Sequence, residues 1–223
     1  MLSREQARDF YDRFGAKQDS QKFYEDPAVR VLLAHADLQA AKAVFEFGCG
    51  TGRLAEELLS QHLSEDASYA GCDLSATMVG LARARLARFG ARAQVRQTDG
   101  APRLDAPDAA YDRVVSTYVL DLLPEEDMGT VLGEAHRVLT PGGRLCLVGL
   151  TEGTTLPSRA IIALWKTLHR IRPAIVGGCR PVELRAFLSD QQWQIDHRSV
   201  VVAFGIPSEV LVARKRSAGA SSV

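Results

Sequence analysis

The sequence has no excess of either charge. Lys and Arg together number 27, as do Asp and Glu, so the formal net charge of the 223 residues is zero. A protein that binds nucleic acid through its phosphates needs a basic surface. The balance therefore argues against nucleic acid as the main partner, although it leaves room for a local basic patch.

Long apolar runs and a secretory leader are also missing. No run approaches the roughly 20 apolar residues that are needed to span a bilayer. The amino-terminal stretch is charged and has no apolar core, unlike a signal peptide. We therefore expect a cytoplasmic protein that has at most a peripheral contact with a membrane.

Paired cysteines are absent as well. Cys49, Cys72, Cys146 and Cys179 form no C-x-x-C pair and, together with the five histidines, show no spacing typical of metal ligands. Three of them lie in or beside apolar strand-like runs, as small buried residues do in a reducing compartment. The sequence predicts no metal site and gives no indication of the oligomeric state.

Strand and helix patterns alternate through most of the chain, and an apolar share of 46% is enough for one core. The predicted strands are 43–47, 68–73, 93–97, 112–118 and 144–150, and the predicted helices between them are about 53–61, 76–89 and 125–138. This alternation predicts an α/β fold with a Rossmann-like, doubly wound and mostly parallel sheet. Two further β-rich runs, 194–203 and 209–213, predict a carboxy-terminal antiparallel hairpin and about seven strands in all.

The segments around this alternation are predicted to be helical. An amphipathic helix is expected at 3–14, a second helix is expected to begin at Asp26-Pro27, and another is expected to begin at Pro181. Residues 217–223 are small and polar and are expected to form a flexible tail.

One short loop carries the strongest signal. Ala43–Phe47 has strand character, Gly48, Gly50 and Gly52 follow at alternate positions, and a helical pattern begins after them. Glycines in such a turn let the backbone approach a ligand at the carboxyl end of a strand. A dinucleotide fingerprint needs its third glycine where Arg53 stands. The spacing therefore favours a nucleoside ligand without a pyrophosphate.

Four segments resemble the motifs of the class I S-adenosylmethionine-dependent methyltransferases, in the order of that family. They are Glu46–Gly52, Gly71–Ser75 followed by Met78, Gln97–Gly100 and Glu134–Arg144. The resemblance implies a methyltransferase domain at 43–216, preceded by an N-terminal helical lid at 1–42. It also implies S-adenosyl-L-methionine as the cofactor, but it says little about the methyl acceptor.

Three acidic residues have roles in the resembling family. The resemblance implies that Asp73 accepts hydrogen bonds from the ribose hydroxyls, that Asp99 accepts one from the adenine amino group, and that Glu46 holds the ammonium group of the cofactor. Each has a structural alternative. Asp73 is also explained as a turn residue beside Ser75, Asp99 as part of an Asp-Gly turn, and Glu46 as a support for the glycine loop.

Further side chains complete the predicted cofactor site. The full set of candidates is Tyr11, Glu46, Gly48, Cys49, Gly50, Gly52, Asp73, Leu74, Met78, Asp99, Gly100 and Tyr118. Cys49 is not expected to act as a nucleophile, because no base lies near it in the sequence. For Tyr11 and Met78, contact with the ligand and ordinary core packing are equally open alternatives.

The catalytic residue is unknown from the sequence. The transferred methyl group is expected near the end of the fourth strand, where Tyr118 and Asp121 are the nearest polar candidates, and His169 is a third. Asp121 is somewhat better explained as a cap before Pro124. The loop lacks the Asn/Asp-Pro-Pro-Tyr motif that the family's nucleic-acid and protein N-methyltransferases often carry, which favours a small-molecule acceptor. A general base is needed only if the acceptor arrives protonated.

A helical insertion at about 151–180 bears on the acceptor. Its predicted helix, 157–172, combines apolar residues at helical spacing with positive charge. The helix either covers the sheet, or walls the acceptor pocket with Trp165 and His169, or rests on an anionic membrane surface. The last alternative would suit a lipid-like acceptor.

Three functions compete at this stage. The leading prediction is a methyltransferase that acts on a small-molecule or lipid-like acceptor by in-line transfer to O, N or C. The alternatives are an NAD(P)-dependent oxidoreductase and a non-catalytic S-adenosylmethionine-binding protein. The spacing of the glycine loop argues against the oxidoreductase, whereas the sequence leaves the binding protein open.

Overall fold

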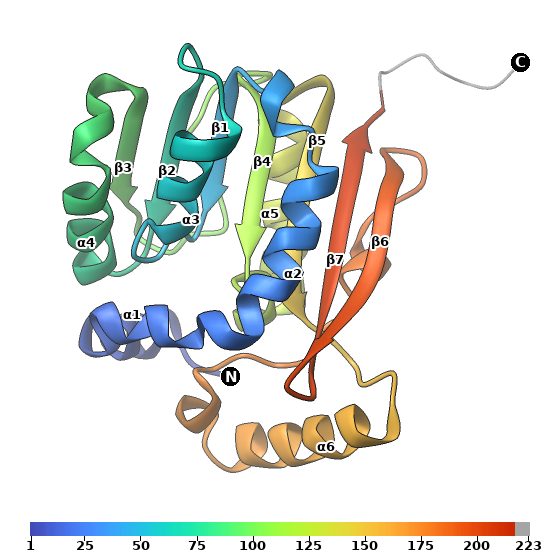
Figure 1. Ribbon diagram of the computed structural model, residues 1–223. Helices are drawn as coiled ribbons and strands as arrows, with labels where there is room; N and C mark the ends of the chain where they lie inside the picture. The colour runs from blue at the N-terminus through green and yellow to red at the C-terminus, as the bar shows by residue number, and fades with distance from the viewer. Residues whose placement is uncertain (217–223) are drawn as a thin grey trace, which may run out of the picture.

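The computed structural model describes residues 1–216, and its centre is a seven-stranded sheet in the order β3-β2-β1-β4-β5-β7-β6 (Figure 1). The strands are β1 (Ala43–Phe47), β2 (Ser68–Asp73), β3 (Ala93–Gln97), β4 (Tyr111–Thr117), β5 (Leu139–Leu150), β6 (Trp193–Ala203) and β7 (Ile206–Lys215). Strands β1 to β5 are parallel, and β7 runs antiparallel to both β5 and β6. The predicted fold class, with its carboxy-terminal hairpin, is confirmed. The predicted tail at 217–223 lies outside the described residues.

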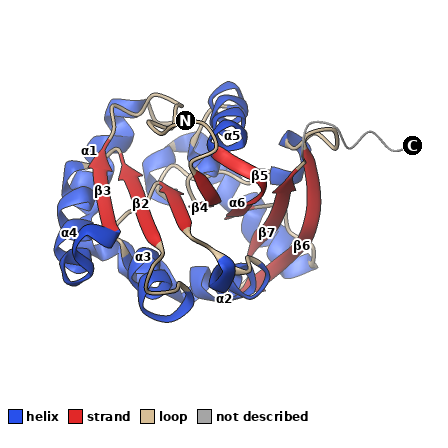
Figure 2. Ribbon diagram, turned by 90° about the horizontal axis from the view of Figure 1, so that it is seen from above, coloured by secondary structure: helices blue, strands red, loops and turns tan. Residues whose placement is uncertain are grey.

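Helices cover both faces of this sheet (Figure 2). One face carries α2 (Lys22–His35), α3 (Arg53–Glu57) with the π-helical turn Leu58–His62, and α4 (Ala76–Leu86), while α5 (Glu125–Val138) lies on the other face. In Figure 1, α1 (Arg4–Phe14) and α6 (Leu156–Ile171) run along the edge at which the parallel strands end. The short 3-10 segments are Gly15–Gln21, Leu38–Ala40, Ala87–Arg92, Leu120–Leu122, Pro173–Val176 and Leu184–Phe187.

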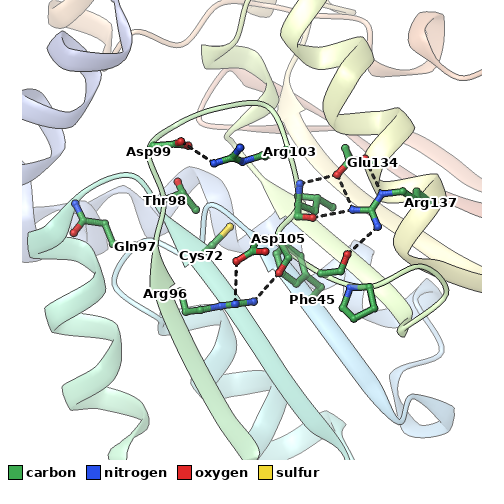
Figure 3. A pocket seen from close by; sticks show the side chains of 13 residues that line it. Phe45, Cys72, Arg96, Gln97, Thr98, Asp99, Arg103, Asp105, Glu134 and Arg137 are labelled. Atoms are coloured by element: carbon green, nitrogen blue, oxygen red, sulfur yellow. Dashed lines mark hydrogen bonds and ion pairs between the residues drawn. The ribbon is translucent and has the colours of Figure 1, made fainter.

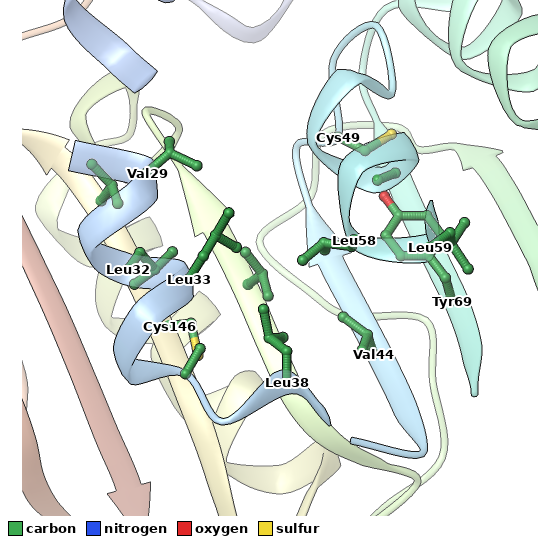
Figure 4. Packing of buried hydrophobic residues seen from close by; sticks show 14 of the residues in the cluster. Val29, Leu32, Leu33, Leu38, Val44, Cys49, Leu58, Leu59, Tyr69 and Cys146 are labelled. Atoms are coloured by element: carbon green, nitrogen blue, oxygen red, sulfur yellow. The ribbon is translucent and has the colours of Figure 1, made fainter. Parts of the chain in front are cut away.

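The strands separate two apolar clusters because successive side chains of a strand point to opposite faces. On β1, Val44 packs with α2, α3 and α4, whereas Phe45 packs on the side of α5. Figure 4 shows the first cluster, which brings together Val44 of β1, Leu32 of α2 and Leu58 of the π-helical turn. Since both faces are covered, a ligand can reach the sheet only at the ends of the strands.

Helix α2 begins earlier than the sequence pattern suggests. The prediction that a helix starts at Asp26-Pro27 is wrong, because α2 starts at Lys22 and contains Pro27 in its interior. Proline has no amide hydrogen, so the carbonyl of Phe23 loses its helical partner. Tyr24 and Glu25 in this first turn are buried, and their packing holds the turn helical despite that loss.

The helix predicted to begin at Pro181 is also wrong, since the segment forms only the 3-10 turn Leu184–Phe187. The amide of Val182 donates to the carbonyl of Leu150, and the amide of Leu184 donates to the buried carboxylate of Glu209. These bonds hold the segment against β5 and β7 with Glu183 in an extended conformation, so no helix can begin at Pro181.

Buried Arg113 on β4 fixes the carboxy-terminal end of α2. Its Nε donates to the carbonyl of Ala36 over 2.8 Å, and its Nη2 donates to the carbonyl of Asp37. The last carbonyls of a helix have no partner inside the helix. A charged donor from the neighbouring strand therefore satisfies them and joins α2 to the centre of the sheet.

Asp121 is a fully buried acid in the connection that follows β4. Its Oδ2 accepts from the amide of Leu150 over 3.0 Å, and its Oδ1 has no hydrogen-bond partner among residues 1–216. Burial raises the pKa of this carboxyl to about 7. The expected role of Asp121 as a cap before Pro124 is replaced by this contact with the end of β5.

A substitution at Gly52 tests how closely α4 packs on the glycine loop. Its φ is +75°, and a Cβ there would lie 2.9 Å from the Cα of Ala82 in α4. We expect Gly52→Ala to lower the free energy of unfolding by about 2–4 kcal/mol, through backbone strain and overpacking. In the matched control Gly129→Ala, an exposed position inside α5 with nothing within 4 Å, stability should rise by up to about 1 kcal/mol. Urea unfolding measures the free energy of unfolding of both variants. Equal changes in the two variants would contradict this packing.

The buried carboxyl of Asp121 predicts an unusual pH dependence of stability. Below pH 7 the folded chain keeps a proton on Asp121 that the unfolded chain releases near pH 4. Stability that depends on this proton is present at low pH and is lost as the pH rises through about 7. We expect the free energy of unfolding of the wild type to fall by about 2–3 kcal/mol between pH 5 and pH 8 relative to Asp121→Asn. Urea unfolding at both pH values measures this difference, and parallel pH profiles would contradict it.

Candidate functional site

A cleft of about 440 Å³ opens where β1, β2 and β4 end. In the sheet, β2 and β3 lie on one side of β1, whereas β4 and β5 lie on its other side. Such a reversal of strand order leaves a crevice outside the carboxyl ends of the strands. The glycine loop after β1, the end of β2, the turn after β4 and the segment around α1 form the wall of the cleft.

The loop after β1 presents its backbone to this cleft. The amides of Gly48 and Cys49 both donate to the carbonyl of Cys72 over 2.9 Å, which holds the loop against β2. Gly48 approaches Val119 so closely that a Cβ would lie 2.3 Å from its side chain. At Gly50, with φ +51°, a Cβ would meet nothing within 4 Å, so this backbone faces open space in which a ligand fits.

Asp73 joins the glycine loop to the start of α4. Its Oδ2 accepts from the amide of Gly50 and its Oδ1 from the amide of Ser75, each over 2.9 Å. The hydroxyl of Ser75 in turn caps α4 by accepting from the amide of Met78. Asp73 therefore has the structural role of a turn residue, and the remaining lone pairs of its carboxylate can still accept from a ligand in the cleft.

Two carboxyls in the wall of the cleft have raised pKa values. Glu46 is buried and accepts a hydrogen bond from the hydroxyl of Tyr69 over 2.5 Å. Glu25 is buried at the other side of the cleft, and its carboxylate lies 3.5 Å from the guanidinium of Arg53. Burial raises the pKa of each carboxyl to about 7. Both groups therefore change charge near neutral pH.

Tyr118 stands at the centre of the cleft, directly after β4. Its backbone has φ +55°, a strained conformation for a bulky residue. The amide of Tyr118 donates to the carbonyl of Val148 over 2.7 Å, and its hydroxyl lies 2.8 Å from that of Ser208. Its ring meets the ring of Tyr24 edge to face, with centroids 5.8 Å apart. Together these contacts fix the position of the ring and stabilise the strained backbone conformation of Tyr118.

The amino-terminal segment closes over the cleft through several polar contacts. Asp12 of α1 accepts from the hydroxyl of Ser75 and the amide of Thr77, and Tyr11 donates to the carbonyl of Gly177 over 3.2 Å. Asp19 accepts from Thr51 and pairs with Arg85, each over 2.6 Å. Side chains of this segment, among them Tyr11 and Asp19, therefore line the cleft, whereas α2 packs on the face of the sheet. The lid at 1–42 stays a prediction.

Ten of the predicted cofactor residues line the cleft. They are Tyr11, Glu46, Gly48, Cys49, Gly50, Asp73, Leu74, Met78, Gly100 and Tyr118. Gly52 does not, because it serves the packing against Ala82. Asp99 does not either: its side chain is 61% exposed, and it accepts from the amide of Ala101 and pairs with Arg103. The hydrogen bond from Ala101 lowers the pKa of Asp99. The expectation that its carboxylate faces the adenine is therefore corrected.

Only one of the three catalytic candidates reaches the cleft. Tyr118 lines it, whereas Asp121 and His169 do not. Asp121 is enclosed beneath the end of β5, and the Nε2 of His169 faces the carbonyl of Gly178 over 3.2 Å. A role for either side chain in direct contact with the acceptor does not fit this geometry.

Sequence reasoning assigned no site role to Glu25, Arg53, Gln18 or Asp19. All four line the cleft. Glu25 precedes Val29 and Leu32 by four and seven residues, so it lies on the apolar face of α2. An acid on the buried face of a helix is a signal that could have identified it. The pairing of Glu25 with Arg53 depends on tertiary contact and left no trace in the sequence.

A second cavity lies on the other side of β2, between the loop after β3 and α5 (Figure 3). Its charged side chains pair with one another: Arg96 with Asp105, Arg103 with Asp99, and Arg137 with Glu134. The cations and carboxylates of this cavity are therefore already satisfied. The glycine loop does not border it, so the cleft at Asp73 is the candidate site.

Comparison with known proteins agrees with this location. Residues 44–143 match the family described as "Methyltransferase domain". A phosphatidylethanolamine N-methyltransferase of Cereibacter sphaeroides is 33% identical over 129 residues, which cover 57% of this chain and 59% of that protein. A tRNA N(3)-methylcytidine methyltransferase of Drosophila melanogaster is 27% identical over 147 residues, covering 61% and 45%. The chain thus spans about half the length of these relatives.

A solved structure resembles the fold over nearly its whole length. The N-methyltransferase NodS of Bradyrhizobium japonicum, in complex with S-adenosyl-L-homocysteine, superposes with a TM-score of 0.71 at 18% identity and covers 95% of this chain and 99% of that chain. The matched family segment contains the glycine loop, Asp73 and the strands that bring them together. Residues 44–143 therefore match a methyltransferase domain, and the chain as a whole has the fold of a solved methyltransferase.

Proposed function

We propose that this chain transfers the methyl group of S-adenosylmethionine to a small-molecule or lipid-like acceptor. The observation that carries the proposal is the composition of one cleft. It is lined by the backbone at Gly50, the carboxylate of Asp73 and the apolar side chains of Val119, Leu122 and Leu123. One cleft thus combines polar groups that can bind a nucleoside with apolar side chains that can exclude water during methyl transfer.

The cleft fits the cofactor in size and in the groups that line it. The free lone pairs of Asp73 suit two ribose hydroxyls, and Leu74 and Met78 offer apolar contact for an adenine ring. At the opposite side, ionised Glu46 would hold the ammonium group of the methionine part. Because the backbone at Gly50 faces open space, the ligand can approach it closely.

The cofactor supplies an electrophilic methyl group on a sulfonium when it is bound. The chain has to place the acceptor in line with this group and exclude water from the space between them. The fixed ring of Tyr118 and the neighbouring leucines serve this positioning. When the acceptor arrives protonated, Glu25 is the group that would take the proton. It faces the cleft, and its pKa of about 7 makes it a base at neutral pH.

The choice of acceptor rests on the wall of the cleft and on the charge of the chain. Apolar side chains such as Val119, Leu122 and Leu123 line the cleft, together with the ion pair of Arg4 and Asp127. A lipid acceptor is named for the Cereibacter relative and a tRNA for the Drosophila relative. The zero net charge disfavours the second kind of acceptor.

Replacing Asp73 tests its role in holding the cofactor. We expect Asp73→Ala to weaken the binding of S-adenosylhomocysteine by at least about 1.5–3 kcal/mol, the scale of hydrogen bonds to a charged group. The loss of the bonds to Gly50 and Ser75 adds to this effect. Asp73→Asn keeps one acceptor oxygen and should bind with intermediate affinity. Isothermal titration calorimetry measures all three proteins.

The matched control for this prediction is Asp99→Asn. Its carboxylate lies outside the cleft, so the affinity for S-adenosylhomocysteine should stay within about twofold of the wild type, as for a surface substitution. Unchanged binding by Asp73→Ala would remove Asp73 from the site. A strong loss in Asp99→Asn would show that the loop after β3 rearranges to contact the ligand.

An acceptor screen tests the activity itself. The purified chain is incubated with S-adenosylmethionine and, separately, with quinols, phenols, amines, phosphatidylethanolamine in vesicles, or tRNA, and the release of S-adenosylhomocysteine is followed. We expect turnover with an uncharged aromatic or a lipid acceptor and none with tRNA. Tight cofactor binding without turnover on any acceptor would favour a non-catalytic binding protein, and turnover on tRNA would overturn the proposed class of acceptor.

A further inference from the structure

Helix α6 presents an unusually apolar face outward from the fold. The side chains of Leu156, Leu164 and Ile171 are 81%, 60% and 73% exposed, and Ile175 in the following turn is 56% exposed. Ala160, Ala163 and Thr167 are exposed between them. At 100° per residue these positions form one stripe along the helix. A contiguous apolar surface of this kind marks a site of interaction.

The orientation of this helix is fixed from its inner side. Ile162 is buried, Trp165 donates from Nε1 to the carbonyl of Cys179 over 2.9 Å, and Nε2 of His169 faces the carbonyl of Gly178. Gly205, at the tip of the β6-β7 hairpin, lies so close to α6 that a Cβ there would meet the side chain of Ile161. The helix therefore cannot turn its apolar stripe inward without breaking these contacts. It neither covers a face of the sheet nor lines the cleft with Trp165.

The segment around α6 has a strong positive charge in a chain that is neutral overall. Residues 153–182 contain no Asp or Glu but contain Arg159, Lys166, Arg170, Arg172 and Arg180. The first four of these are exposed, and Arg159, Lys166 and Arg170 follow one flank of the apolar stripe. Within the described residues, Lys166 pairs with Glu152, the acid just before this segment.

We propose that the exposed face of α6 docks on the surface of a membrane that contains anionic lipids. An apolar stripe flanked by basic side chains on one helix is the pattern of helices that lie in the interface of a bilayer. Acidic headgroups match the charge of the segment. A second copy of the chain would instead set two such basic segments against each other, and like charges across an interface are costly.

An acidic protein partner is less suited to this surface than a lipid bilayer. The stripe runs along a convex helix, and neither the cleft at Asp73 nor the cavity beside α5 borders it. None of the helices in residues 1–216 is both long and apolar enough to cross a bilayer. A helix with one apolar stripe and one basic flank docks with its axis parallel to the membrane surface.

This docking would bring the candidate site close to the lipid. The chain that follows α6 forms part of the support of the cleft: the carbonyl of Gly177 accepts from Tyr11, and Gly178 packs against Leu2 and Leu122. All three of these side chains line the cleft. The inference deepens the proposed function, because an acceptor dissolved in the membrane would reach the cleft beside α6.

Vesicle flotation tests the proposal on the full chain. The wild type is mixed with vesicles of phosphatidylcholine alone or of phosphatidylcholine and phosphatidylglycerol in equal parts. We expect binding to the mixed vesicles at least about tenfold tighter than to the neutral ones, because each basic side chain near the surface contributes about 1 kcal/mol. This preference should decline as salt is added.

Two double variants separate the apolar from the basic contribution. Leu164→Ser with Ile171→Ser should lower binding to mixed vesicles by about tenfold or more, the effect of two exposed aliphatic side chains that no longer enter the bilayer. Arg170→Gln with Arg172→Gln should reduce the preference for anionic vesicles by about tenfold. The matched control Val200→Ser removes an exposed apolar side chain from β6 and should leave vesicle binding unchanged.

Binding of S-adenosylhomocysteine is measured on the same samples, so that the two proposals can fail separately. Normal cofactor binding without vesicle binding would overturn the membrane surface alone. Sedimentation velocity tests whether a second copy of the chain occupies this face instead. A concentration-dependent dimer that is abolished in the Leu164 and Ile171 double variant would also overturn the proposed membrane surface. Loss of cofactor binding in the wild type would instead count against the proposed function.

Discussion

The geometry of the candidate site depends on the carboxylate of Asp73. This side chain at the end of β2 holds the amide of Gly50 in the loop after β1 and the amide of Ser75 at the start of α4. Gly50, which lies 23 residues before Asp73 in the sequence, is thereby fixed beside the end of β2 and the start of α4 at one edge of the sheet. A carboxylate is suited to this task because it only accepts hydrogen bonds and has lone pairs for several donors at once. The same capacity leaves it free to receive a ligand.

Burial of acids accompanies this arrangement. Glu25 and Glu46 lie in the wall of the cleft, and Asp121 lies just beneath the end of β5, each with a pKa of about 7. A buried carboxylate costs free energy unless partners stabilise its charge. Clusters of perturbed groups in a cleft are typical of functional sites. Here they surround a space that has to receive a cationic cofactor, whose positive charge would favour their ionised forms.

The parallel strands and the glycine loop could be predicted from the sequence because their signals are local. Val44 and Phe45 belong to a short apolar run that ends in alternating glycines, and the predicted and observed bounds of β1, β2 and β3 coincide. Element boundaries that depend on tertiary contacts could not be predicted from the sequence pattern. The start of α2 at Lys22 relies on the burial of Tyr24 and Glu25, which outweighs the interruption at Pro27.

The candidate site was predicted in part for the same reason. Asp73 follows a strand directly, so its place at the sheet edge is set by the strand itself. Asp99 stands two residues beyond β3, where a local turn with Ala101 and Arg103 decides its orientation instead. Glu25 and Arg53 come from elements far apart in the chain, and only the packing of α2 beside α3 brings them together. The outward face of α6 likewise depends on which of its sides meets the hairpin.

The anchoring of α2 by Arg113 has a consequence for ligand entry. The end of α2 is bonded to β4 through Ala36 and Asp37, and its apolar side chains belong to the core. Residues 4–21 are instead held largely by polar contacts, such as those of Asp12 and Asp19, with a glycine of positive φ at position 15 between α1 and the 3-10 segment. If residues 4–21 moved about Gly15, the anchored α2 would keep its place, and cofactor exchange would require no unfolding of the core.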